Sequence, residues 1–161
     1  MLVPFNKLPE DARIWIYQSS RKFSDEEVTQ LQSQLDAFLE QWTAHGANLS
    51  AAAQIKYNFF IIIGLDQHTN AASGCSIDAQ VHFIQELEQE MNVELLDKMN
   101  VSYIQNERVH QKSLLDFKKM VKDGAVGKNT TVFNNLVNNK LEFEENWEVP
   151  AIESWHSRFF K

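Results

Sequence analysis

The sequence is poor in cysteine, glycine and proline. Its 161 residues include one cysteine, five glycines and three prolines. A single thiol, Cys75, excludes an internal disulfide and a zinc site built from several thiolates, and it indicates a reducing compartment. The low glycine and proline content excludes collagen-like and linker-like chains.

Basic side chains are also scarce relative to acidic ones. There are 15 lysines and arginines against 22 aspartates and glutamates, so the net charge is -7. A surface of this sign repels a polyanion unless its basic residues are locally clustered. We therefore predict that nucleic acid is not a partner of this acidic protein.

Long hydrophobic runs are missing as well. The longest one, residues 59–65, is about a third of the roughly 20 residues that a membrane helix needs. Residues 1–9 have neither the basic nor the apolar region of a secretory signal. We expect no membrane partner, a cytoplasmic location and, from the chain length, a single domain spanning residues 1–161.

What is present is a regular order of hydrophobic patterns in residues 1–110. Two short runs, residues 13–19 and 59–65, are apolar on both faces, as central strands are. Two segments that begin near Ser24 and Ser76 have apolar residues at helical spacing. Residues 52–57 and 101–105 alternate like edge strands. The order predicts an α+β fold with a ferredoxin-like βαββαβ sheet of strand order 4-1-3-2.

The last fifty residues are expected to cover the open face of that sheet. Residues 113–122 and 130–140 have helical spacing, and the aromatic tail, residues 147–160, is too apolar to stay in water. We therefore predict a helical C-terminal extension over residues 111–161. A dimer partner on the same face is the open alternative.

Several segments together resemble a known family. They are residues 42–46, 70–88, 96–101, 132–137 and 146–160. They resemble a family of small uncharacterised bacterial proteins of about this length, many of which carry the label "ABC transporter ATPase". The resemblance covers nearly the whole chain, and it implies no activity, substrate or catalytic residue.

The ATPase label can be tested against the chemistry of phosphate binding. A P-loop has the pattern G-x-x-x-x-G-K-[ST] between a strand and a helix. The nearest segment, residues 124–129, has two residues between its glycines, and Asn129 replaces the metal-binding hydroxyl. We therefore reject ABC-type ATP hydrolysis.

Polar side chains are expected to gather at one edge of the predicted sheet. Antiparallel neighbours 13–19 and 59–65 place the loop after the second strand at the edge where the first helix ends, near His45. We predict a site at this edge, between His45 and residues 66–78. Its candidate ligand-binding residues are Trp42, Asp66, Gln67, Ser73, Gly74, Ser76 and Asp78, and its candidate catalytic residues are Cys75 and His45.

Two functions of different classes fit this edge. The first is a non-enzymatic module that binds a small ligand or a protein. The alternative is a Cys75-dependent enzyme of acyl-transfer or thiol chemistry, with His45 or His156 as its base, because free amides at a helix start favour a thiolate. Cys75 also fits a small buried residue behind the N-cap.

The segment around Ser73 and Ser76 bears on the ligand class. Its amides and hydroxyls suit a small anionic ligand, although Asp66 and Asp78 bring like charge. Asp78 and His82 have metal-ligand spacing but no third ligand, so we predict neither a metal nor a cofactor. A homodimer remains the other open partner.

Overall fold

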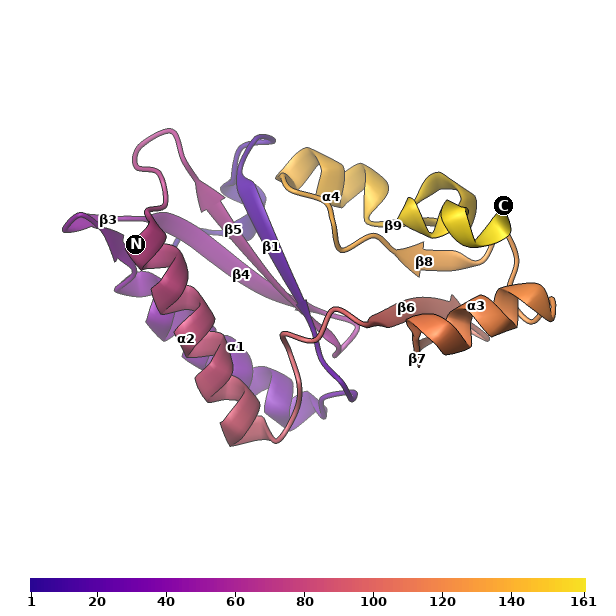
Figure 1. Ribbon diagram of the computed structural model, residues 1–161. Helices are drawn as coiled ribbons and strands as arrows, with labels where there is room; N and C mark the ends of the chain where they lie inside the picture. Colours follow the sequence, from indigo (N-terminus) through magenta and orange to yellow (C-terminus); the bar gives the residue numbers. More distant parts are fainter. The chain divides into compact units, whose positions relative to one another are not determined.

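The computed structural model describes residues 1–161, and the chain forms two compact units. The first comprises residues 1–96 and 138–141, and the second comprises residues 97–137 and 142–161. Both mix helices with antiparallel strands, so the chain is an α+β protein (Figure 1). No helix combines the length and the apolar character that crossing a membrane requires.

The first unit is built on a three-stranded antiparallel sheet of order β1-β5-β4. β5 is the central strand, and six of its seven residues are therefore buried, in agreement with its apolar run FIIIGL. Ile16 pairs with Ile62, and Ala53 pairs with Ile63. The elements of this unit are η1 (Phe5–Lys7), β1 (Arg13–Gln18), α1 (Asp25–Glu40), β2 (Thr43–Ala44), β3 (Ala47–Asn48), β4 (Ser50–Lys56), β5 (Phe60–Asp66) and α2 (Gly74–Met91).

Helices α1 and α2 lie side by side on one face of this sheet (Figure 1). Their apolar stripes meet alternate residues of the central strand β5, which are fully removed from solvent. The core on this face includes Leu31, Leu35, Leu39, Ile61, Ile63, Ile84 and Leu87. Burial of this kind, rather than helix propensity, holds both helices in place.

The other face of the sheet is packed by the N-terminal segment. Leu8 and Ala12 form a small cluster with Ala52 of β4. Gly64 in β5 allows Leu8 to come close, since a Cβ atom at this position would lie 2.5 Å from the Leu8 Cδ1 atom. Lys140 belongs to the same unit, and its Nζ atom donates to the Leu8 carbonyl at 2.7 Å.

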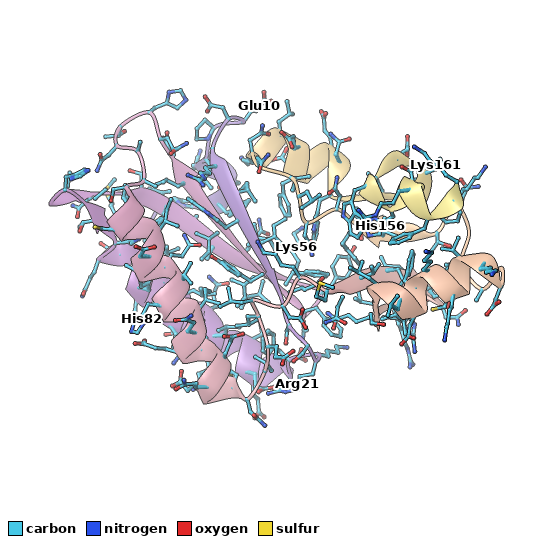
Figure 2. All side chains as sticks on the ribbon, viewed as in Figure 1. Glu10, Arg21, Lys56, His82, His156 and Lys161 are labelled. Atoms are coloured by element: carbon cyan, nitrogen blue, oxygen red, sulfur yellow. The ribbon has the colours of Figure 1, made fainter.

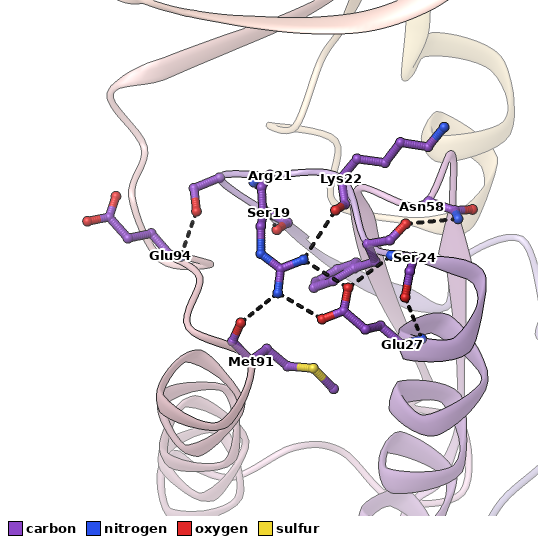
Figure 3. A network of polar contacts seen from close by, with 10 residues as sticks. Ser19, Arg21, Lys22, Ser24, Glu27, Asn58, Met91 and Glu94 are labelled. Carbon is purple, nitrogen blue, oxygen red and sulfur yellow. Dashed lines mark hydrogen bonds and ion pairs between the residues drawn. The ribbon is translucent and has the colours of Figure 1, made fainter.

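A polar network ties the start of α1 to the end of α2 (Figure 3). The Arg21 guanidinium donates to both carboxylate oxygens of Glu27, at 2.9 and 2.8 Å, and to the Met91 carbonyl at 2.7 Å. Glu27 also closes the capping box of Ser24, which confirms the predicted start of this helix. The pair with Arg21 lowers the pKa of Glu27 to about 2.

The second unit has its own four-stranded antiparallel sheet, of order β7-β6-β8-β9. Phe117 of α3 packs on Tyr103 of β6, with ring centroids 5.6 Å apart, and on Phe159 at 5.7 Å. The aromatic tail is therefore packed within this unit. Its elements are β6 (Asn100–Gln105), β7 (Arg108–Ser113), α3 (Leu114–Lys122), β8 (Thr131–Phe133), α4 (Lys140–Asn146), β9 (Glu148–Pro150), η2 (Ala151–Glu153) and η3 (Trp155–Phe160).

The ferredoxin-like strand order is wrong at its fourth position. The order β1-β5-β4 agrees with the expected 1-3-2 part, but β6 does not join this sheet, so β1 is an edge strand rather than the predicted central one. It pairs with β7 and β8 instead, and the outer edge of β1 carries only a bridge from Arg13 to Asn139. Alternation in residues 101–105 predicted an edge strand with one buried face. Instead Val101, Ser102 and Tyr103 are all buried, because β6 lies between β7 and β8.

The predicted boundary at residue 110 is also not where the two units divide. Residues 97–110 group with the C-terminal segment, which carries strands as well as helices. Residues 113–122 do form the expected helix, but residues 130–140 contain β8 and turns. Two β-branched threonines and several asparagines favour this outcome over a helix.

Candidate functional site

A pocket of about 450 Å³ lies in the first unit, at the end of α1 and the start of α2. The short β2–β3 hairpin forms its third side. No carboxylate faces it, and its only titratable side chains are those of His45 and Cys75. The lining residues are Ala37, Phe38, Gln41, Trp42, Thr43, His45, Ser73, Cys75, Ser76 and Ala79.

Trp42 forms the fixed wall of the pocket. Its indole Nε1 atom donates a hydrogen bond of 2.8 Å to the Ser76 carbonyl oxygen, and only 3% of its surface is exposed. Its ring meets Trp15 edge-on, with centroids 6.0 Å apart. A buried indole that has its hydrogen-bond partner is rigid, so this wall is preorganised.

Phe38 continues the apolar wall along α1. It stacks on Phe83 of α2 with ring centroids 4.5 Å apart and an angle of 11° between the planes. Its ring also lies 6.0 Å from that of Trp42. The half-buried Phe38 therefore offers an aromatic surface held by two neighbours.

His45 reaches the pocket from a tight turn rather than from a helix end. Helix α1 ends at Glu40, and Thr43 and Ala44 then pair with Ala47 and Asn48. His45 and Gly46 form the two-residue loop, with φ of 52° and 78°. Both residues of such a loop adopt the left-handed conformation, which suits glycine and strains histidine mildly.

The start of α2 differs from the prediction by three residues. Ser73, not Ser76, is the N-cap, and the two serines form a reciprocal capping box. The Ser76 hydroxyl also donates to the Ser73 carbonyl at 2.9 Å. Both hydroxyls are thus used within the helix start, which leaves less of the anion site than the sequence suggested.

Cys75 lies in the first turn of α2 and is exposed. The interpretation of a thiol buried behind the N-cap is therefore wrong. The amides of Gly74 and Cys75 have no carbonyl acceptor within the helix, as is general for the first amides of a helix. The structure brings the Cys75 thiol, the His45 imidazole and the Trp42 ring to the same pocket.

Four other predicted site residues do not line this pocket. They are Asp66, Gln67, Gly74 and Asp78. Asp66 Oδ1 accepts the His68 amide at 2.9 Å, and both Gln67 and Asp78 face solvent. His82 projects from α2 away from the sheet and pairs with Glu86 at 3.2 Å rather than with Asp78 (Figure 2).

Half of the residues that line the pocket were not predicted. Ala37, Phe38, Gln41, Thr43 and Ala79 were not among the candidates. Two spacings could have found part of it, because Phe38 precedes Trp42 by four residues and Cys75 precedes Ala79 by four. The loop contact was also missed, in which Asn70 Nδ2 donates to the Ala47 carbonyl at 3.2 Å.

His156, the other base considered for Cys75, is fully buried in the second unit. Its Nδ1 atom lies 2.8 Å from the Ser154 hydroxyl, its ring stacks on Trp155, and its Nε2 atom has no hydrogen-bond partner. Burial lowers its pKa to about 4, and the positive charge of Arg158 acts in the same direction. A fully buried imidazole does not accept a proton from a solvent-exposed thiol.

A second pocket, of about 440 Å³, lies beside the edge strand β4. It is lined by residues 2–5, Gln32, Asp36 and Ala53. Its polar groups satisfy one another, since Gln32 Nε2 donates to Asp36 at 2.9 Å and to the Ala53 carbonyl at 3.1 Å. The pocket at Trp42 is therefore the better candidate site.

The glycine segment considered for phosphate binding connects helix α3 to strand β8. A P-loop connects a strand to a helix, so that helix amides face the phosphate. The glycine segment has the opposite order of elements.

Comparison of the chain with protein-family models, with curated proteins and with solved structures gives no significant match.

Proposed function

We propose that this protein is a non-enzymatic binding module whose pocket at Trp42 receives an apolar group of its ligand. One observation carries this proposal, namely the open pocket of about 450 Å³ with a preorganised aromatic wall. Ligand sites are typically concave and mostly apolar, with a few polar groups that orient the ligand. This pocket has an apolar wall of Ala37, Phe38, Trp42 and Ala79, and polar side chains line the rest of it.

The polar groups at the rim indicate what accompanies the apolar group. The Cys75 amide lies at the positive end of the α2 dipole, and no carboxylate lines the pocket to oppose a negative charge. Phe38 provides the accessible aromatic surface, and the buried Trp42 supports the wall behind it. The preferred ligand therefore combines an apolar body with a hydrogen-bond acceptor or an anionic group.

The test uses two small probes, phenylacetate and benzyl alcohol, which share a ring and differ in charge. Binding is followed by ¹H–¹⁵N NMR up to roughly 10 mM, a range that detects weak specific pockets. We expect shifts of the Trp42 indole, Cys75 and Ala79 signals, with phenylacetate binding more tightly than benzyl alcohol.

Ala79→Trp fills the pocket from α2 and should abolish these shifts, whereas Gln89→Trp, on the exposed surface of the same helix, should leave them unchanged. Shifts spread over both units, or equal shifts in the two variants, would refute the binding proposal.

A second candidate function rests on the shared position of Cys75 and His45 in this pocket. It is a Cys75-dependent enzyme of acyl-transfer or thiol chemistry, in which His45 removes the thiol proton. Alkylation by iodoacetamide, measured from pH 5 to 9, tests it. A reactive thiolate well below pH 8 that slows about tenfold in His45→Asn supports this function. Equal rates in both proteins rule it out.

A further inference from the structure

Helix α3 in the second unit presents a cationic outer face. Phe117 points into the core, so the residues on the opposite side of the helix face solvent. This surface consists of Leu115, Lys118, Lys119 and Lys122, and we call it the α3 face. None of its three lysines forms an ion pair, and Leu115 beside them is 76% exposed.

Helix capping explains only part of this face. Lys119 and Lys122 lie in the last turn, where they stabilise the helix dipole. Lys118 lies before the last turn, and a leucine with most of its surface in water gains nothing from the helix dipole. An apolar side chain surrounded by cations is typical of a contact with a partner that is apolar at one point and acidic beside it.

The outer stripe of helix α2 in the first unit has that complementary pattern. Five residues spaced four, three, four and four apart follow one another along one side of the helix. The first two, Cys75 and Ala79, line the pocket at Trp42, and the last two are acidic. The stripe consists of Cys75, Ala79, His82, Glu86 and Glu90, and we call it the α2 stripe.

The two helices match in spacing. Seven residues separate Ala79 from Glu86, and seven separate Leu115 from Lys122, which is about 10 Å along each helix. When Leu115 faces the pocket and the helices run parallel, Lys122 lies opposite Glu86. In the antiparallel orientation the lysines would point away from the acidic end.

We propose that the α3 face of one molecule docks on the α2 stripe of a second copy of this chain, with Leu115 in the pocket at Trp42. This inference rests on the proposed function, because it names the apolar group that the pocket receives. The two contacting surfaces differ. Two molecules form a closed dimer if each docks its α3 face on the α2 stripe of the other, and otherwise successive molecules assemble into open chains.

The distribution of charge favours a second copy over nucleic acid. The second unit has equal numbers of acidic and basic side chains, so the first unit carries the whole net charge of -7. A polyanion drawn to the α3 face would be repelled by the first unit. A second copy instead offers that acidic unit as the complementary surface.

The experiment measures self-association by sedimentation velocity at roughly 0.5 mM protein, a concentration suited to weak contacts. We expect association at 50 mM salt that weakens at least about tenfold at 500 mM salt, since exposed charges are screened. Lys118→Glu/Lys119→Glu/Lys122→Glu should be monomeric. A control of equal charge change, Lys7→Glu/Lys56→Glu/Lys161→Glu, should still associate, because these lysines are exposed elsewhere.

A charge swap tests the pairing itself. Glu86→Lys/Glu90→Lys should also be monomeric on its own, and mixing it with the triple Lys→Glu variant should restore association. All substituted residues are exposed, so circular dichroism should show an unchanged fold. Leu115→Gln should weaken association at every salt concentration.

Three outcomes would overturn the docking proposal: a monomeric wild type at low salt, association of both charge variants on their own, or binding of a duplex RNA through the α3 face. Phenylacetate binding is measured separately, so its persistence in a monomeric protein would leave the proposed binding function intact. Saturating phenylacetate should inhibit self-association if both occupy the pocket.

Discussion

The indole of Trp42 donates a buried hydrogen bond of 2.8 Å to the carbonyl oxygen of Ser76. This bond joins the second residue after α1 to the first turn of α2, and it positions the aromatic wall of the pocket. The pocket therefore depends on the packing of two helices that are distant in sequence.

Trp42→Phe should destabilise the protein by about 1–3 kcal/mol. The substitution removes a buried hydrogen bond and leaves unfilled volume beside Trp15. Urea unfolding measures the change, and the phenylacetate shifts should weaken in parallel. A change below about 0.5 kcal/mol would show that the bond contributes nothing beyond an ordinary surface contact.

Gly64→Ala should destabilise the first unit by about 1–3 kcal/mol, because the added Cβ atom overlaps Leu8 Cδ1 at 2.5 Å and crowds Ile14 Cδ1 at 3.2 Å. Thermal or urea unfolding measures it. Gly74→Ala is the matched control, since no atom lies within 4 Å of its added Cβ, and it should be neutral or slightly stabilising. Equal effects of the two substitutions would contradict the close packing of Leu8.

His156 should make stability depend on pH between about 4 and 6.5. Its pKa is about 4 in the folded protein against an ordinary 6.5, so the unfolded chain binds more protons in this range. The stabilisation is complete above pH 6.5 and is lost as the pH falls towards 4, by roughly 3 kcal/mol.

Urea titrations of wild type and His156→Phe should differ in this window, the variant showing a flatter profile. His82→Gln, at an exposed histidine, is the control and should retain the wild-type slope. If the profile of His156→Phe keeps the full slope, the buried imidazole is not its source.

Glu27 should dominate a separate, more acidic window. Its pKa is about 2 instead of 4.5, chiefly because the Arg21 guanidinium donates to its carboxylate. The stabilisation is present above pH 4.5 and is lost as the pH falls towards 2. Glu27→Gln should reduce this slope in acid titrations followed by circular dichroism, whereas Glu26→Gln, an exposed neighbour, should not. Similar slopes in both variants would exclude the ion pair as the cause.

The candidate site shows what sequence reasoning can reach. His45, Trp42, Ser73, Cys75 and Ser76 were predicted to share one edge, and all five line the same pocket. Antiparallel pairing of β1 with β5 is sufficient for that inference. The exclusion of Asp66 and Asp78 depends on side-chain direction in a loop and on a helix, which spacing alone does not specify.

Strand β7 shows where the pattern gives no signal. Its sequence, RVHQKS, is polar on both faces, as an edge strand with charged residues is. The turn before it places Asn106 and Glu107 at φ of 55° and 63°. Asparagine adopts this conformation readily and glutamate does not, so the turn lacks the usual sequence signature of a hairpin.

The sequence by itself determined the local elements that bury one face. The capping box at Ser24 and the apolar spacings in α1, α2 and α3 report helices. The short apolar runs of β1 and β5 and the alternation in β4 and β6 report strands, because each pattern depends only on neighbouring residues. The tertiary structure alone decided which sheet β6 joins, that the chain divides at residue 97, and that Phe38 and Ala79 complete the pocket. These are pairings between distant segments, and a strand with one apolar face satisfies its burial equally well against either sheet.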